Sequence, residues 1–300
     1  MKKIVFFIWI IVGLLVSCET PISITLPEHS TTMVVEGWIE NGQHPVVIVS
    51  HSMDYYSSIG MDAILASVEK NCIVKVTDSD GNEEQLQLGF TYDHIFGLLN
   101  AAYVGKSLVG QPGKTYYLYI EDTAGNIYTS TTTIPQNTVQ VDSVKINIEH
   151  PEDTTALGRI YFTDNSSTYD CYRFFTKVKN LDVIYTQILY GCYDDLTFNG
   201  KQMNYEMIRM PMSNLDVSAM LGIDAEEYGR MYFKKGDTVY VKSTITDTAT
   251  LNYWFPMQVD INMMMMPFRI SGTYPTNITG DNVIGIWSGY HARYDTLVFE

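Results

Sequence analysis

Short runs of alternating apolar and polar residues, separated by turn residues, dominate the sequence from Thr31 onward. The first pair flanks Asn41-Gly42, a dipeptide that strongly favours a hairpin between two strands. Short strands at such regular spacing are typical of an immunoglobulin/fibronectin-like β-sandwich. We therefore predict one such domain over residues 31–135. Its paired runs are 33–39 with 45–49, 72–77 with 85–88, and 115–120 with 127–131.

A second β-rich domain is predicted over residues 136–300, after the linker-like segment Ile134-Pro135-Gln136-Asn137. Apolar residues at helical spacing predict a helix near 250–264, and Pro267 would end it. A short helix is also expected within 215–228. The fold class is therefore mainly β: two β-sandwich-like domains with one or two short helices. The clearest strands of the second domain are 139–148, 159–163, 171–178, 183–193 and 238–245.

The first residues have the pattern of an export signal. Lys2 and Lys3 precede an apolar stretch from Ile4 to Leu15, which is too short to span a bilayer. Leu15-Val16-Ser17-Cys18 resembles a bacterial lipobox, which implies cleavage before Cys18 and lipid on that cysteine. We expect a signal peptide over 1–17 and a lipid-anchored tether over 18–30; an ordinary signal peptide with an incidental cysteine is the alternative.

The charge balance restricts the partners of the mature protein. The whole chain has a formal net charge of −15, and removal of 1–17, which carries two lysines and no acids, makes it −17. Nucleic acids and anionic lipids are bound through clusters of Lys and Arg. We therefore expect no nucleic-acid partner.

Three cysteines follow Cys18, and none has the spacing of a structural zinc site. If 171–178 and 183–193 form a hairpin with Leu181 and Asp182 at its tip, Cys171 lies opposite Cys192, close enough for a disulfide. A small change of register would leave two buried free thiols instead. Both outcomes are open, and Cys72 is expected in the core.

No combination of residues indicates catalysis. The six histidines are scattered singly, and no Gly-x-Ser-x-Gly or His-Glu-x-x-His occurs. Asp194-Asp195 and Glu226-Glu227 are interpreted as solvated turns, since neighbours on a strand point to opposite faces. Asp78 to Asn82 is interpreted as a hairpin turn, because its glycine is misplaced for a calcium loop. We expect no catalytic residue, no metal and no cofactor other than lipid on Cys18.

Two places are candidates for a protein interface. Tyr55 and Tyr56 lie in a long connection from Met53 to Lys70, and Met263 and Met264 begin a run of four methionines. Exposed tyrosines are frequent in interfaces, and flexible thioethers suit apolar contacts. For the methionines, the end of a core-facing helix is the alternative. A second long connection is expected over 94–109.

The order of several segments resembles the Bacteroidota outer-membrane lipoprotein family known as domain of unknown function 4249. The lipobox precedes Val34-Val35-Glu36-Gly37-Trp38-Ile39, and further matching segments follow: Pro112 to Leu118, Gly236 to Val241, Asn277 to Gly280, and Gly285 to Tyr290. The resemblance covers nearly the whole mature chain. It implies an outer-membrane protein, often encoded beside a TonB-dependent receptor, and supplies no catalytic residue. Trp287-Ser288 stands where the family is expected to have a Phe-Gly-like pair.

These observations predict a non-enzymatic outer-membrane lipoprotein that helps a TonB-dependent transporter to capture or take up a ligand. The ligand is unknown, and the contacts would come from 53–70, 94–109 and the second domain. A surface adhesin or fimbria-like structural protein is one alternative, and a glycan-binding module is another. Only Glu19 is acidic beside Cys18, so the leaflet and the face of the membrane remain open.

Overall fold

A computed structural model describes residues 31–53, 63, 66–92, 99–150, 152–210, 224–262 and 274–300. Residues Thr31–Glu300 form one compact unit. The fold is mainly β, as predicted, with three sheets and two helices among the described residues. No helix in the described ranges combines the length and the apolar character needed to cross a membrane.

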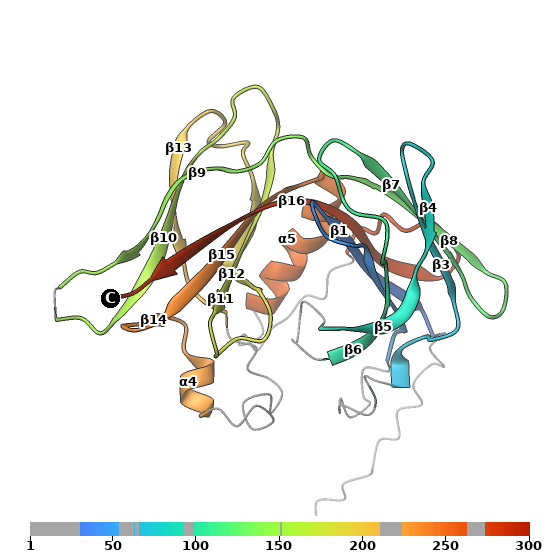
Figure 1. The fold of residues 1–300 in the computed structure, drawn as a ribbon, viewed down its shortest axis with the longest axis horizontal. Coiled ribbons are helices and arrows are strands. Elements are labelled where there is room, and N and C mark those ends of the chain that lie inside the picture. Colours follow the sequence, from blue (N-terminus) through green and yellow to red (C-terminus); the bar gives the residue numbers. More distant parts are fainter. Residues whose placement is uncertain are drawn as a thin grey trace, which may run out of the picture. The chain divides into compact units, whose positions relative to one another are not determined.

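An eight-stranded sheet runs through both halves of the unit (Figure 1). Two four-stranded sheets pack against it, one on each half. In spatial order, the strands of the long sheet are β12 (Thr186–Asp194), β11 (Cys171–Val178), β15 (Thr238–Thr246), β16 (Val283–Val298), β1 (Met33–Glu40), β2 (Val46–His51), β6 (Leu99–Val104) and β5 (Gln87–Tyr92).

The two smaller sheets each cover one half of the long sheet. In Figure 1, β3, β4, β7 and β8 lie on the right, and β9, β10, β13 and β14 lie on the left. We call the corresponding halves of the unit the first and second lobe. Their strands are β3 (Ile73–Asp78), β4 (Glu83–Gln85), β7 (Thr115–Glu121) and β8 (Ile127–Thr133), and β9 (Gln140–Asn147), β10 (Thr155–Thr163), β13 (Gln202–Met207) and β14 (Phe233–Lys234).

The strand β16 joins the two lobes. Its first half, Val283 to Tyr290, pairs in parallel with β1, and its second half, Tyr290 to Val298, pairs antiparallel with β15. Because this pairing joins residues about 250 positions apart, the lobes are not two consecutive segments. The sequence predicted a boundary at 135/136; the structure instead adds Ile278 and Trp287 to the core of the first lobe.

Each lobe has its own apolar core, formed by alternate residues of the facing strands. In the first lobe Val35 and Ile39 of β1 belong to the same core cluster as Leu118 of β7. In the second lobe Phe174 of β11 meets Phe162 of β10, with their ring centroids 5.4 Å apart. The strands predicted over 33–39, 72–77 and 115–120 are therefore confirmed as half-buried sheet strands. The strand predicted over 171–178 is confirmed too, and it is buried on both faces.

Two glycines permit the close contact between β1 and β16. A Cβ atom on Gly37 would lie 2.7 Å from Cε3 of Trp287, and one on Gly285, which has φ of 137°, would lie 1.9 Å from the Val35 carbonyl oxygen. Both distances are too short for a real side chain. Trp287 is fully buried and donates its indole N–H to the Tyr116 carbonyl at 3.1 Å. This packing explains the glycine in the Val-Glu-Gly-Trp-Ile segment.

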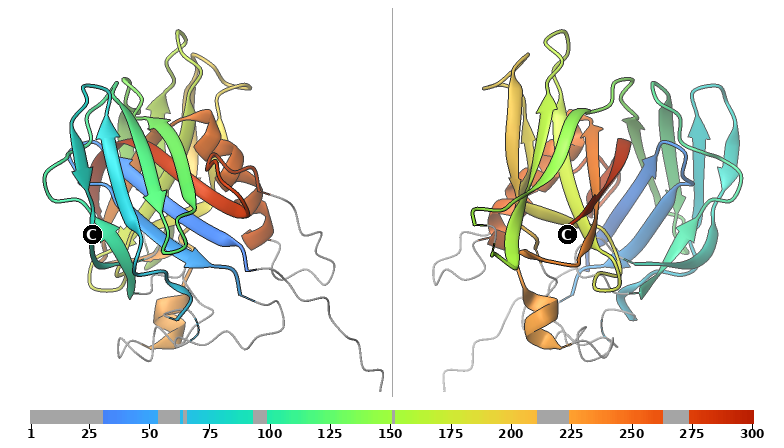
Figure 2. Two further views of the ribbon diagram at one scale, coloured as in Figure 1. Left: turned by 90° about the vertical axis from the view of Figure 1, so that its right-hand side faces the viewer. Right: turned by 60° about the vertical axis from the view of Figure 1, so that its left-hand side comes forward.

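The helix α5 (Thr248–Asn262) confirms the helix predicted near 250–264. It lies on the face of the long sheet opposite the second-lobe core, against β11, β12 and β16 (Figure 2). Asp247 begins it, since its carboxylate accepts a hydrogen bond from the Thr250 amide at 2.8 Å. The shorter helix α4 (Ala225–Gly229) begins after the cap residue Asp224 and falls at the end of the segment 215–228.

Two expectations about the first lobe are corrected. The run predicted as one strand, 85–88, is divided between β4 and β5, which belong to different sheets. Leu86 between them is buried in the core, where the chain crosses from one sheet to the other. The connection expected over 94–109 contains the strand β6, whose residues 100–103 are buried.

The hairpin of β11 and β12 is confirmed, but its register is not the one that would allow a disulfide. Cys171 lies opposite Asp194, and Cys192 lies opposite Arg173. An irregularity between Arg173 and Phe175 shifts the pairing, and such a shift moves side chains relative to their partners. Cys72, Cys171 and Cys192 are buried free thiols. The disulfide alternative is therefore wrong.

Candidate functional site

The outer face of the β4-β3-β7-β8 sheet forms a groove with a volume of about 820 Å³. It arises from strict alternation in β7: Tyr116, Leu118 and Ile120 enter the core, whereas Tyr117 and Tyr119 point outward. Tyr117 is 47% exposed. The groove therefore presents phenol rings to solvent, over a sheet whose inner face fixes the backbone. Its floor is completed by Ile73, Lys75, Thr129 and Thr131.

Polar groups surround these rings. Lys75 Nζ lies 3.0 Å from Glu83 Oε1, and the Tyr119 hydroxyl donates to Glu121 Oε2 at 2.8 Å. The hydrogen bond to Glu121 raises the pKa of Tyr119. A face that combines an exposed and a half-buried tyrosine with hydroxyl, carboxylate and ammonium groups can stack on a flat apolar surface and hydrogen-bond its edge.

The far rim of the groove is built by a segment distant in sequence. Thr129 and Thr279 exchange backbone hydrogen bonds of 2.9 Å and 2.7 Å, so residues from 277 to 279 extend the sheet beside β8. Asn277 is held in turn, because its side chain bonds the Trp287 backbone through both its oxygen and its nitrogen. The groove is thus coupled to the strand that joins the lobes.

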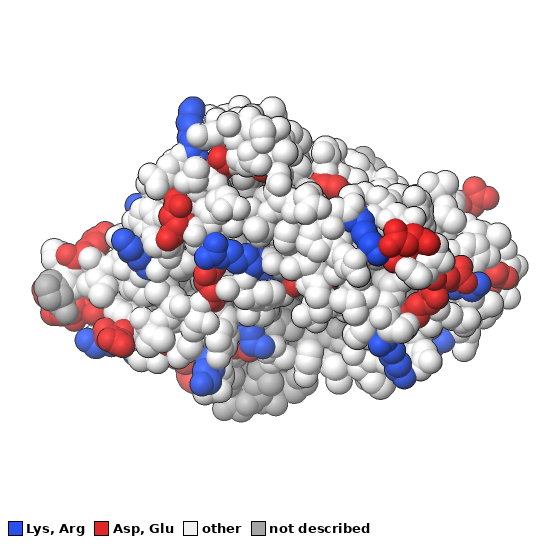
Figure 3. Space-filling view, turned by 45° about the horizontal axis from the view of Figure 1, so that its top comes forward, with Lys and Arg blue, Asp and Glu red and all other residues white. Residues whose placement is uncertain are grey.

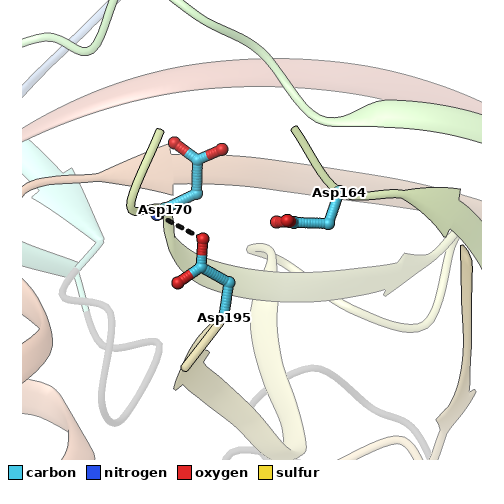
Figure 4. A group of neighbouring side chains, drawn as sticks. All are labelled: Asp164, Asp170 and Asp195. Carbon is cyan, nitrogen blue, oxygen red and sulfur yellow. Dashed lines mark hydrogen bonds between the residues drawn. The ribbon is translucent and has the colours of Figure 1, made fainter. Parts of the chain in front are cut away.

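A second site is a buried group of three carboxylates in the second lobe (Figure 4). Asp164 follows β10, Asp170 precedes β11 and Asp195 follows β12. Each offers an oxygen within 4.8 Å of the others, and their residues are 4%, 4% and 1% exposed. In Figure 4, Asp164 points toward the space between the other two, and the Asp170 amide donates to Asp195 Oδ2 at 2.9 Å.

The donors around this group do not neutralise its charge. Asp164 accepts from the Tyr172 hydroxyl and the Gly200 amide, both at 2.6 Å, and Asp170 accepts from Thr168 at 3.0 Å. Burial raises the pKa of Asp170 and of Asp195. Three buried carboxylates need a proton or a cation to share one site.

Oxygen donors of this kind suit a hard cation such as Ca²⁺, which takes six to eight of them. The three residues supply three carboxylate ligands, about half of that set. The sequence predicted no metal site and placed Asp195 in a solvated turn; the second prediction is wrong, since Asp195 is almost fully buried. No local pattern joins all three positions, because Asp164 and Asp170 lie in the connection between β10 and β11 and Asp195 follows β12.

A third feature lies under α5, where two buried cations meet aromatic rings. The Arg173 guanidinium lies 4.2 Å from the Trp254 ring centroid and 4.8 Å from that of Phe175. Within the described residues its hydrogen-bond acceptors are neutral: Gln187 Oε1 at 2.7 and 2.9 Å, and the Tyr290 hydroxyl. Lys242 lies over the same Phe175 ring and pairs with Glu40.

These contacts fasten the sheet at the junction of the lobes. Arg173 comes from β11, Lys242 from β15, Tyr290 from β16 and Glu40 from β1, so one polar cluster connects four neighbouring strands. Cation–π contacts partly replace the hydration that both cations lose. We assign this cluster a structural role.

Charged residues on the surface are interspersed. On the face drawn in Figure 3, Lys and Arg side chains lie singly or beside acids, and wide uncharged areas separate them. That face presents no basic patch of the kind that binds a phosphate backbone.

The remaining residues singled out by the sequence cannot be placed. Cys18, Tyr55, Tyr56, Met263 and Met264 lie outside the described residues. The groove tyrosines were not singled out, although the alternation in 115–120 already puts Tyr117 and Tyr119 on one face. That alternation was the signal in the sequence from which the outward-facing tyrosines could have been identified.

Comparison with known proteins places the chain in one family. A family model described as Domain of unknown function (DUF4249) matches residues 19–293. No curated protein matches the chain.

Proposed function

Because the chain belongs to the DUF4249 family, we propose that it is a non-enzymatic lipoprotein of the outer membrane that captures a ligand for a TonB-dependent transporter. Lipid on Cys18 would hold it in the membrane. The lipobox-like segment and the resemblance to Bacteroidota lipoproteins support this location, and the groove on the first lobe supports ligand capture.

The groove is the observation that carries the proposal. A volume of about 820 Å³ falls in the range of small-molecule sites. Its rings are fixed by a packed sheet, so little ordering is needed when a ligand binds. The nearest ionisable groups are held in pairs: Lys75 with Glu83, and Glu121 with the Tyr119 hydroxyl. This arrangement suits a ligand that is recognised and released unchanged.

A glycan is the ligand class that this lining favours. Tyr117 and Tyr119 offer ring faces for the apolar side of a sugar, and the hydroxyls of Thr129 and Thr131 lie beside them. An uncharged, hydroxyl-rich ligand also meets no repulsion from a mature protein with a net charge of −17, which is −15 less the two lysines of residues 1–17. The glycan-binding alternative therefore becomes part of the proposal.

The adhesin-like alternative is less favoured. Donation of a strand between subunits needs a strand without a partner in its own chain. Each strand in the described part of the chain pairs with another strand of the same chain.

Two experiments test the proposal. The tagged lipoprotein is purified with detergent from outer membranes of the producing bacterium, and a TonB-dependent transporter is expected among the recovered proteins; a Cys18→Ala variant should lose it. Separately, a glycan array is probed with the wild type and Tyr117→Ala. Removal of the ring should weaken binding about tenfold, whereas Tyr190→Ala, which removes a tyrosine of 55% exposure in the other lobe, should not. Absence of any transporter refutes the accessory role. Equal glycan binding by all variants refutes the assignment of the groove as the glycan-binding site.

A further inference from the structure

An apolar patch lies on the outermost strand pair of the long sheet. Its members are Leu88, Phe90, Tyr92 and Leu99, with exposed fractions of 49%, 74%, 39% and 47%. The antiparallel register of β5 and β6 sets Leu88 opposite Tyr103 and Tyr92 opposite Leu99. Since opposite residues share a face, these four side chains lie on one side of the pair. We call them the β5 patch.

The β5 patch carries no charge. Neither Gln87–Tyr92 nor Leu99–Val104 contains Asp, Glu, Lys or Arg. The charged neighbour Lys106 donates to Gln87 at 2.6 Å, which is the end of β5 farthest from Tyr92. Exposed edge strands usually carry a charge or a proline that discourages contact. This one has neither, so the patch is suited to an apolar environment.

The direction of the strands places the patch beside the point where the chain enters the unit. β1, β2, β6 and β5 are successive antiparallel neighbours. The start of β1 at Met33 therefore lies at the same end of the sheet as Tyr92 and Leu99. Fifteen peptide units separate Cys18 from Met33, so this end can be no more than about 50 Å from a lipid on Cys18.

We propose that the β5 patch contacts the lipid surface to which Cys18 is anchored. The inference rests on the anchoring part of the proposed function and not on the groove. Phe and Leu side chains would enter the region between headgroups and acyl chains, and Tyr92 would lie at the polar boundary that amphipathic rings favour.

A membrane explains the patch better than a second copy of the chain. Two β5 strands paired edge to edge would satisfy their backbone groups, but they would leave the same side chains exposed, because added strands extend a sheet without covering its faces. A lipid surface covers the side chains themselves. The mature net charge of −17, which is −15 less the two lysines of residues 1–17, means that attraction to anionic headgroups cannot drive the contact.

Flotation with vesicles tests the proposal. The chain from Glu19 lacks the anchor and keeps the whole compact unit, and it is mixed with vesicles of pure phosphatidylcholine. We expect flotation that is insensitive to salt and that falls at least tenfold in the double variant Phe90→Ser, Leu99→Ser. Leu196→Ser is the matched control: Leu196 is 73% exposed in the second lobe, and its loss should change nothing.

A second readout does not require the protein without its anchor to bind vesicles strongly enough to float. Phe90→Trp in the lipidated protein, placed in vesicles with brominated phosphatidylcholine, should show more quenching than the wild type. Failure of the wild type to float together with absent quenching at position 90 overturns the proposal. So does flotation equal in all variants, or a dimer in solution that the double variant abolishes. If the double variant still co-purifies with a transporter, the proposed function is unaffected. The membrane contact and the proposed function can therefore be refuted independently.

Discussion

Glu40→Gln should strongly destabilise the protein. Glu40 is 3% exposed; its Oε2 pairs with Lys242 and its Oε1 accepts from the Tyr294 hydroxyl. Lys242 is itself 8% exposed, and the buried Arg173 contacts the same rings, Phe175 and Tyr290. Glu40 is thus the carboxylate that pairs with the buried Lys242.

The magnitude follows from that burial. Removal of one partner of a buried ion pair costs about 3–5 kcal/mol, because the other charge is left without compensation. Both partners are buried, so solvent screening gives little relief. We expect about 3 kcal/mol, which corresponds to a Tm lower by roughly 6–12 °C for a unit of this size.

Urea unfolding followed by tryptophan fluorescence measures the change. Lys242→Met alone should also destabilise the protein, whereas Glu40→Gln combined with Lys242→Met should recover most of the loss, since an apolar side chain of similar volume replaces the ion pair. A loss below about 1 kcal/mol for Glu40→Gln, or a double variant no better than the single one, would refute the view that this pair fastens β1 to β15 across β16.

Three further outcomes are expected. In the absence of reductant, a thiol reagent at pH 8 should label the native chain from Glu19 negligibly and the same chain at three sites once it is unfolded. Burial raises the pKa of its three thiols, to about 11 for Cys72 and Cys192 and to about 12 for Cys171. Two labelled sites or fewer would indicate a disulfide. In a chelating buffer, Asp170→Asn should gain stability relative to the wild type as the pH rises from 4 to 7. The pKa of Asp170 is higher in the folded state than in the unfolded state, so the folded wild type binds this proton more tightly. The wild type therefore loses stability as the pH rises through the folded pKa. A pH-independent difference would contradict this. Gly37→Ala should cost about 1–3 kcal/mol through the clash with Trp287, measured by urea unfolding, whereas Gly229→Ala, which meets no atom within 4 Å, should be nearly neutral.

Local pattern was sufficient for most of the strands and for α5. The alternation in β1 and β7 and the turns at Asn41-Gly42 and Ala124 to Asn126 depend on neighbouring residues, so a single sequence contains them. The same alternation identifies the outward tyrosines of the groove.

What depended on distant pairing could not be predicted. The parallel contact between β1 and β16 joins the two ends of the chain, and no local signal distinguishes it from an ordinary edge strand. The burial of Asp195 has the same origin: its neighbours Asp164 and Asp170 come from another loop. The register of β11 and β12 was missed because the pairing shifts between Cys192 and Gln187. Gly191 lies in that irregular stretch, and Tyr190 before it has a positive φ of 56°, but a lone glycine inside an apolar run does not by itself fix where the pairing shifts.

The most direct test of the proposed function is affinity purification of the lipidated, tagged protein from the outer membrane of the producing bacterium. The account predicts that a TonB-dependent transporter is recovered in amounts comparable with the lipoprotein and is lost with Cys18→Ala. Recovery of the lipoprotein without any such transporter, under conditions that preserve other outer-membrane complexes, would contradict it.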